Sequence, residues 1–141
     1  DRLLAVARIR PVVDQIELHP YWQQPGLLPV LARHDIVAEA WYPLGHGSRE
    51  LLAEPAIVAA ATVHGKSPAQ VVLRWHLQRG FVAIPKSTDP AHIAANFDIG
   101  DFALSADEMA AVDALGRARP MQRIPRWVMS LARFARPRPR P

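Results

Sequence analysis

Apolar runs of strand length alternate with helical patterns along the first 116 residues of the chain. The runs cover residues 12–18, 36–41 and 81–85. The helical patterns cover residues 27–34, 55–64, 68–77 and 105–116, and a short helix is expected to begin at Pro90. Strands that alternate with helices favour parallel βαβ units. The sequence therefore predicts an α/β domain over residues 1–116.

Helix boundary signals support these elements. One helix is expected to end at Gly65, and the next is expected to begin at Ser67 and Pro68. Ser105 and Glu108 have the spacing of a capping box. Asp89 is the expected N-cap of the helix that begins at Pro90. Three parallel strands alone make a poor sheet, because such strands need cover on both faces and neighbours at both edges. The predicted domain is therefore part of a larger fold.

Composition narrows the functional classes. The chain has 141 residues, of which half are hydrophobic, and it contains no cysteine, which excludes disulfides and thiolate metal sites. Its six histidines lack metal-ligand spacing, so we expect no metal site. No apolar run is long enough to span a bilayer, and the first residues lack the layout of a signal peptide. We therefore expect a cytoplasmic protein.

The net charge of +4 arises from the end of the chain. All 13 acidic residues precede Arg117, whereas 8 of the 17 basic residues lie from Arg117 onward. Residues 117–141 also contain five prolines. Proline at this density opposes helix and sheet, and like charges repel, so this Arg/Pro-rich tail is predicted to be disordered.

Candidate chemistry lies where the predicted strands end. Gln15, near the end of the first strand, offers an amide suited to binding another amide; the alternative is a strand residue that neighbouring polar groups satisfy. Trp41 ends the second strand and suits stacking on a flat ring, or it belongs to the core. Two glycines follow in the loop after Trp41, where backbone N–H groups approach a phosphate closely.

The third strand is followed by Lys86, Ser87 and Thr88, and then by a capped helix. A cation, two hydroxyls and a helix N-terminus together form an anion cradle. The alternative is an ordinary polar loop. The chain has no P-loop and no GxGxxG motif, and we find no Ser-His-Asp arrangement.

Taken together, these segments resemble the aldo-keto reductases, NADP(H)-dependent oxidoreductases with a (β/α)8 barrel. The motifs that carry the resemblance are DQIELHPY from Asp14, EAWYPLG from Glu39, SPAQVVLRWH from Ser67, IPKS from Ile84, and the pairs Asn96-Phe97 and Asp101-Phe102. The tryptophan in the second motif is most similar to the bacterial branch that includes 2,5-diketo-D-gluconate reductases. The resemblance implies the C-terminal portion of the TIM barrel, about strands 6–8 with their helices.

The resemblance also implies a cofactor site for NADP(H). Gln15 would hold the nicotinamide carboxamide and Trp41 would stack on the nicotinamide ring. Further residues would contact the pyrophosphate (Tyr42, Leu44, Gly45), the adenosine 2′-phosphate (Lys86, Ser87, Thr88) and the adenine (Asn96). His92 and Ala95 stand where the family usually has arginine and glutamate, which weakens the expected preference for NADP over NAD.

The catalytic Asp, Tyr, Lys and His of the family lie on earlier strands that this chain does not contain. We therefore expect a fragment of a carbonyl reductase that is inactive alone and would act on a small carbonyl substrate in the intact enzyme. A misassembled reading frame would explain both ends of the chain, and a separately encoded N-terminal half would complete the barrel. The alternative is a non-catalytic protein whose basic tail binds nucleic acid or an anionic membrane, although a solvated extension is the simpler expectation.

Overall fold

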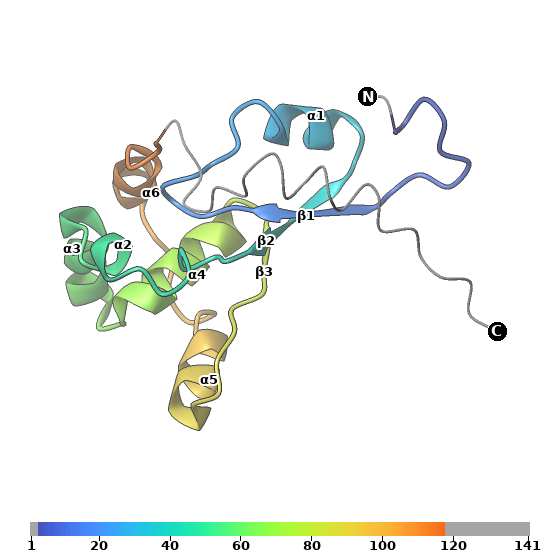
Figure 1. Cartoon of the computed structure of the whole chain (residues 1–141). Helices are drawn as coiled ribbons and strands as arrows, with labels where there is room; N and C mark the ends of the chain where they lie inside the picture. Colours follow the sequence, from blue (N-terminus) through green and yellow to red (C-terminus); the bar gives the residue numbers. More distant parts are fainter. Residues whose placement is uncertain (1–2, 118–141) are drawn as a thin grey trace, which may run out of the picture.

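The three predicted strands form one parallel sheet. The computed structural model describes residues 3–117, and its sheet has the order β1 (Val13–Glu17), β2 (Val37–Trp41), β3 (Val82–Ala83) (Figure 1). Gln15 lies opposite Glu39, which lies opposite Val82 on the next strand. The α/β prediction is confirmed, and the parallel sheet is partial, as predicted.

Six helices accompany this sheet in the described part of the chain. They are α1 (Leu28–Arg33), α2 (Arg49–Leu52), α3 (Pro55–His64), α4 (Pro68–Gln78), α5 (Pro90–Phe97) and α6 (Ala106–Asp113). The helix α1 joins β1 to β2, and α2, α3 and α4 lie between β2 and β3 along the chain. The sequence patterns did not predict α2, because a single turn is too short to show helical periodicity.

The predicted helix boundaries are confirmed by hydrogen bonds. The Ser67 hydroxyl accepts from the backbone N–H of Gln70, and the Gln70 side chain accepts from the Ser67 N–H. Ser105 and Glu108 form the same reciprocal box at α6. At the end of α3, Gly65 has a φ of 63°, a left-handed conformation that glycine adopts without steric cost.

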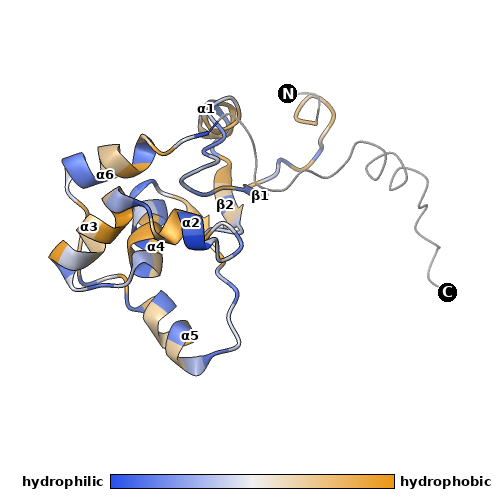
Figure 2. Ribbon diagram, turned by 60° about the vertical axis from the view of Figure 1, so that its left-hand side comes forward, coloured by the Kyte–Doolittle hydropathy of each residue, from blue (hydrophilic) through white to orange (hydrophobic). Residues whose placement is uncertain are grey.

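The core consists of two clusters. The larger one lies where α3, α4 and α6 meet and contains Tyr21, Leu51, Ile57, Ala60, Ala61, Val71, Val72, Trp75, Leu104 and Val112. Figure 2 shows hydrophobic segments on both α3 and α4, although Val58, Val63 and Leu77 of these helices are exposed. The smaller cluster lies between α1 and the sheet and contains Leu18, Leu31, Ile36, Ala38 and Ala40. One face of the sheet is thus covered, and Phe81 touches both clusters.

The third strand differs from the expectation. Residues 81–85 were expected to form a buried strand, but β3 contains only Val82 and Ala83, and Val82 and Ile84 are 44% and 43% exposed. Ile84 still donates its N–H to the Ala40 carbonyl at 3.3 Å. The physical reason is that β3 is an edge strand in the described residues and one of its faces has no cover.

Arg117, the first residue of the predicted tail, contacts the body of the protein. Its N–H donates to the Tyr21 carbonyl at 2.7 Å, and its guanidinium lies 3.5 Å from the Tyr21 ring centroid. Its guanidinium also donates to the Glu50 carboxylate at 2.7 Å. The disorder predicted for the rest of the tail falls on residues 118–141, which lie outside the described residues.

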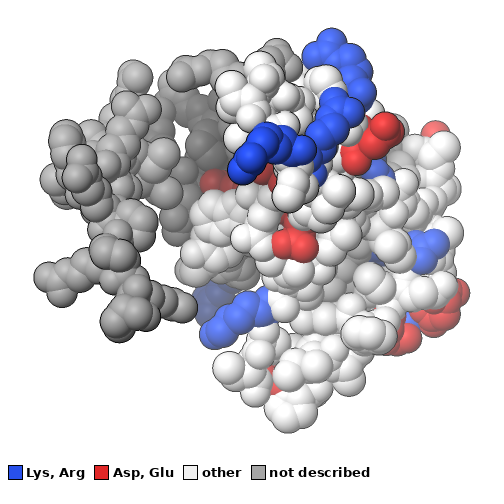
Figure 3. All heavy atoms as spheres, turned by 90° about the vertical axis from the view of Figure 1, so that its right-hand side faces the viewer, with Lys and Arg blue, Asp and Glu red and all other residues white. Residues whose placement is uncertain are grey.

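Charge and hydropathy give two further observations on the described residues. The face seen in Figure 3 carries basic and acidic side chains interspersed among uncharged ones. None of the helices within residues 3–117 combines the length and the apolar character needed to cross a membrane. The cytoplasmic location expected from the sequence stays a prediction.

Candidate functional site

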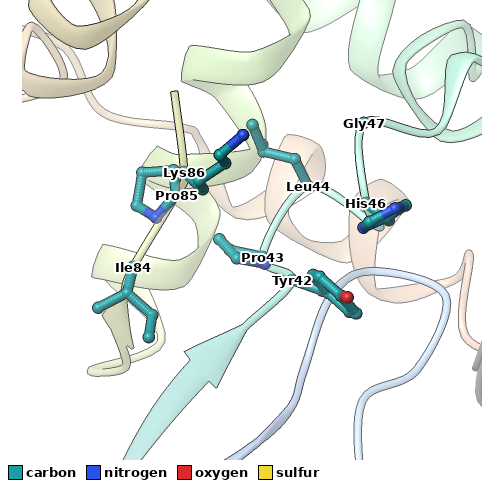
Figure 4. A pocket seen from close by; sticks show the side chains of 8 residues that line it. All are labelled: Tyr42, Pro43, Leu44, His46, Gly47, Ile84, Pro85 and Lys86. Carbon is teal, nitrogen blue, oxygen red and sulfur yellow. The ribbon is translucent and has the colours of Figure 1, made fainter. Parts of the chain in front are cut away.

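The segments that follow the three strands lie at the carboxyl end of the sheet, because parallel strands all end on the same side. The loop after β2 and the segment after β3 line a cavity of about 530 Å³ (Figure 4). Its lining residues are Tyr42, Pro43, Leu44, His46, Gly47, Ile84, Pro85 and Lys86. The structure therefore brings two of the three predicted clusters together.

Lys86 is the cation of this cavity. Its side chain and that of Leu44 extend toward each other across the cavity (Figure 4). Lys86 is exposed, and no hydrogen bond or salt bridge to it is recorded within residues 3–117. An ammonium group without a carboxylate partner retains its full capacity to bind an anion.

A second cavity, of about 470 Å³, lies beside the first. It is lined by Ala83, Pro85, Ser87, Ile93, Asn96, Phe97 and Ile99, so Pro85 belongs to both cavities. Thr88 and His92 line neither cavity. Both are exposed, and the His92 Nδ1 lies 3.8 Å from the Asp89 carboxylate. The predicted residues from Lys86 to Asn96 thus lie along one segment, with Thr88 and His92 at its solvent side.

The N-terminus of α5 is capped by the chain itself. The Asp89 carboxylate accepts from the Ala91 N–H at 2.8 Å, and the Ser87 hydroxyl accepts from the Asp89 N–H at 3.1 Å. Pro90 has no N–H to offer. A phosphate at this place would therefore depend on Lys86 and the hydroxyls of Ser87 and Thr88 more than on the N-terminus of α5. The predicted anion site thus loses part of the contribution expected from the helix.

The loop after β2 has an unusual backbone. Tyr42, Gly45, His46 and Gly47 all have φ values between 55° and 71°, and such values are uncommon for residues other than glycine. The N–H groups of Gly45, Gly47 and Ser48 donate to carbonyls within the loop. The N–H groups of Leu44 and His46 have no backbone acceptor within residues 3–117.

Gln15 and Trp41 lie on the face of the sheet that no helix covers. The Gln15 amide nitrogen donates to the Glu39 carboxylate at 2.5 Å, which leaves the amide oxygen as an acceptor. Trp41 is half-buried, and its ring centroid lies 4.3 Å from that of Tyr42. The alternative, that a polar neighbour satisfies Gln15, is therefore correct for the amide nitrogen, which donates to Glu39.

His19 and Glu17 have a structural role. The His19 Nε2 lies 3.2 Å from the Glu17 carboxylate, and its Nδ1 accepts from the Trp22 N–H. Burial lowers the pKa of His19, against the opposing effect of Glu17. Both side chains are buried, so His19 stabilises the turn after β1 and is not accessible to a ligand.

Sequence reasoning missed several residues that the structure places at the site. Glu39 was not singled out as the partner of Gln15, although alternation along β2 puts it on the same face as Trp41. Ile93 and Phe97 line the second cavity, and their spacing of four residues was the available signal. Within residues 3–117, no group of three or more His, Asp or Glu side chains is arranged to hold a metal ion.

Comparisons with known proteins agree with this arrangement. The profile of the "Aldo/keto reductase family" matches residues 1–117. An aldo-keto reductase of Mycolicibacterium smegmatis is 47% identical over 124 residues, which are 88% of this chain and 44% of that protein. Methylglyoxal reductase DkgA of Escherichia coli is 43% identical over 118 residues, which are 84% of this chain and 43% of that protein.

A solved structure extends the similarity to the fold. A variant of Gox0644 in complex with NADPH superposes with a TM-score of 0.78 at 44% identity, over 83% of this chain and 42% of that chain. The chain thus spans less than half the length of the relatives it matches. The family predicted from the motifs is confirmed: this chain belongs to the aldo/keto reductase family.

Proposed function

We propose that the chain supplies the cofactor-binding part of an NADP(H)-dependent aldo-keto reductase that reduces a small carbonyl compound to an alcohol. The observation that carries the proposal is the cavity between the loop after β2 and Lys86, an exposed cation with no recorded partner in the described residues. Family membership and the NADPH complex of Gox0644 support it.

The residues of the site fit such a cofactor chemically. Lys86, Ser87 and Thr88 follow one another after β3 and would contact the 2′-phosphate, and Asn96 in the second cavity would contact the adenine. His92 stands where the family usually has an arginine and would make this contact weaker. Tyr42, Leu44 and Gly45 would follow the pyrophosphate, where the N–H groups of Leu44 and His46 have no backbone acceptor within residues 3–117. Two adjoining cavities suit an extended dinucleotide better than a single compact ligand.

The bound cofactor would supply the hydride that passes from C4 of the nicotinamide to the carbonyl carbon. This chain's own residues would orient that ring. Trp41 would cover one face of it, and the Gln15 amide oxygen, held by the bond between Gln15 and Glu39, would accept from the carboxamide. Because the ring and its carboxamide would be fixed together, the reacting carbon would be positioned before the substrate binds.

The chain alone is expected to have no reductase activity. The proton donor of the family and its partners lie on strands outside this sequence, so nothing within it would protonate the developing alkoxide. The measurement is NADPH oxidation with methylglyoxal and other small carbonyl compounds. Turnover above the buffer rate would refute this prediction without bearing on cofactor binding.

Replacement of Lys86 by alanine is expected to weaken NADPH binding about ten-fold, in line with a charge-assisted hydrogen bond of roughly 1.5 kcal/mol. NADH lacks the 2′-phosphate, so its affinity should change much less. Both affinities are measured by quenching of tryptophan fluorescence. Arg33→Ala, which removes an exposed cation on α1, serves as the control and should alter neither affinity. Equal loss of NADPH and NADH affinity in Lys86→Ala would contradict the assignment.

A further inference from the structure

A cluster of four side chains ties the helix α2 to the turn after β1. The Arg117 guanidinium lies 3.5 Å from the centroid of the Tyr21 ring, and it also lies 2.7 Å from the Glu50 carboxylate. Glu54, the N-cap of α3, accepts from the buried Tyr21 hydroxyl at 2.5 Å and lies 3.6 Å from the Arg117 guanidinium. We call these four residues the Arg117 cluster.

Arg117 is the cation on which this cluster depends. Glu50 and Glu54 are two negative charges that flank α2 only four residues apart, and the Glu50 carboxylate has no other recorded side-chain partner in the described residues. Burial raises the pKa of the Tyr21 phenol, so Tyr21 stays a neutral donor. Without Arg117 the two carboxylates would keep one neutral donor between them, and α2 would lose its charged attachment.

The helix α2 continues directly from the loop that lines the first cavity (Figure 4). Ser48 ends this loop and is also the N-cap of α2, where its hydroxyl accepts from the Leu51 N–H at 3.2 Å. Within residues 3–117, the recorded hydrogen bonds of residues 42–48 all stay inside the segment 42–52. The loop is therefore held to the rest of the protein by the packing of Leu44 and by α2.

The backbone of the loop needs such a hold. Tyr42 and His46 have φ values of 55° and 59°, which cost free energy for residues other than glycine. Conformations of this kind persist only where the surrounding structure enforces them. The buried Leu51 fixes α2 from the core side, and the Arg117 cluster fixes it from the solvent side.

We propose that Arg117 is a positioning residue of the cofactor site. Through Glu50 and Glu54 it holds α2, and α2 holds the loop of residues 42–48 in the conformation that lines the first cavity. Because the loop is restrained, a dinucleotide that lies along it leaves slowly. The inference rests on the proposed function for the identity of the ligand, whereas the restraint on the loop is a property of the chain without ligand.

The first test is Arg117→Gln in the full chain without cofactor. The variant keeps the backbone N–H that donates to the Tyr21 carbonyl and loses the charge. Hydrogen exchange is expected to become about five-fold faster at the hydrogen-bonded amides of residues 45–52 and to stay unchanged in α4. The effect is modest because an exposed ion pair and a cation over a ring each contribute little.

Arg79→Gln is the matched control for this measurement. Arg79 is also partly exposed, pairs with the Asp113 carboxylate at 3.1 Å and lies 5.8 Å from the Trp75 ring, but it contacts no part of α2 in the recorded interactions of residues 3–117. Its replacement should leave exchange at residues 45–52 unchanged. Equal exchange rates of residues 45–52 in Arg117→Gln and Arg79→Gln would overturn the proposal.

The second test measures nucleotide release by stopped-flow fluorescence. Arg117→Gln is expected to raise the dissociation rates of NADPH and NADH alike by about five-fold, with little change in the association rates or in the urea midpoint. Lys86→Ala should instead affect NADPH alone. A lower urea midpoint with unchanged dissociation rates would reduce Arg117 to a structural role and overturn the proposal.

A double-variant cycle tests the route through Glu50. Glu50→Gln should speed release as Arg117→Gln does, and the double variant should release the nucleotide no faster than either single variant, because both changes break the same contact. Additive effects would overturn the proposal. If the unaltered chain binds neither nucleotide, the proposed cofactor site is refuted, and hydrogen exchange still decides whether Arg117 restrains the loop.

Discussion

Trp75→Ala is expected to remove most of the protein's free energy of unfolding. Trp75 is fully buried in the larger core cluster, and its indole N–H donates to the Asp113 carboxylate at 2.8 Å. The substitution removes the largest side chain of that cluster and leaves the Asp113 carboxylate without this donor. Truncation of a buried Trp to Ala costs roughly 3–5 kcal/mol, which approaches the whole stability of many small domains.

The measurement for Trp75→Ala is urea unfolding followed by circular dichroism. Leu77→Ala on the same helix is the matched control, because Leu77 is half exposed and its truncation removes little buried surface. We expect its unfolding midpoint to stay near that of the unaltered chain. A small effect of Trp75→Ala, comparable with that of Leu77→Ala, would show that α4 does not organise the core.

Stability is expected to fall as the pH decreases from 7 to 5, because His76 is buried in its neutral form. Its Nδ1 lies 2.8 Å from the Val72 carbonyl and its Nε2 lies 3.1 Å from the Leu18 carbonyl. Burial lowers the pKa of His76 to about 4, against the opposing effect of these carbonyls. The neutral ring carries one N–H and therefore donates to only one of these two carbonyls.

The sign of the pH effect follows from proton uptake. Below about pH 6.5, the ordinary value for histidine, the unfolded chain binds a proton at this position and the folded chain does not. Protons therefore favour the unfolded state until the folded pKa is reached, and the contribution is fully present above pH 6.5 and lost toward pH 4. The eventual loss is on the order of 3 kcal/mol. Burial lowers the pKa of His19 as well, which acts in the same direction.

Urea unfolding at pH 7.0, 6.0 and 5.0 measures this slope. The interval lies above the range in which most carboxylates take up protons, so histidines dominate it. His76→Gln retains a hydrogen-bonding side chain without the titration and should flatten the slope, although it lowers stability at every pH. An unchanged slope in His76→Gln would assign the pH dependence to other groups.

Local signals were sufficient to predict several helix ends. Ser67 with Gln70, Ser105 with Glu108, and Gly65 determine where helices begin and end through contacts within a few residues, so the sequence predicts those ends directly. The α2 turn and the true length of β3 were not predictable in this way. The former is too short for periodicity, and the latter depends on the place of β3 at the edge of the sheet within residues 3–117.

The candidate site was only partly predictable. The motifs indicated Gln15, Trp41 and Lys86, because each ends a strand with a side chain of distinctive chemistry. The hydrogen bond from Gln15 to Glu39 and the capping of α5 by Asp89 could be identified only from the structure. Both contacts change how the site would bind a ligand, since one fixes the amide and the other occupies the helix end.

Local pattern and motif were enough to predict the family, the order of the three strands with most of the helices, and the residue types that follow each strand. Three-dimensional packing was needed to show that the segments after β2 and β3 line one cavity, and that one face of the sheet and the helix α5 are uncovered within residues 3–117. Those properties depend on how strands pair side by side and on what covers them, and pairing between distant segments leaves no local trace in the sequence.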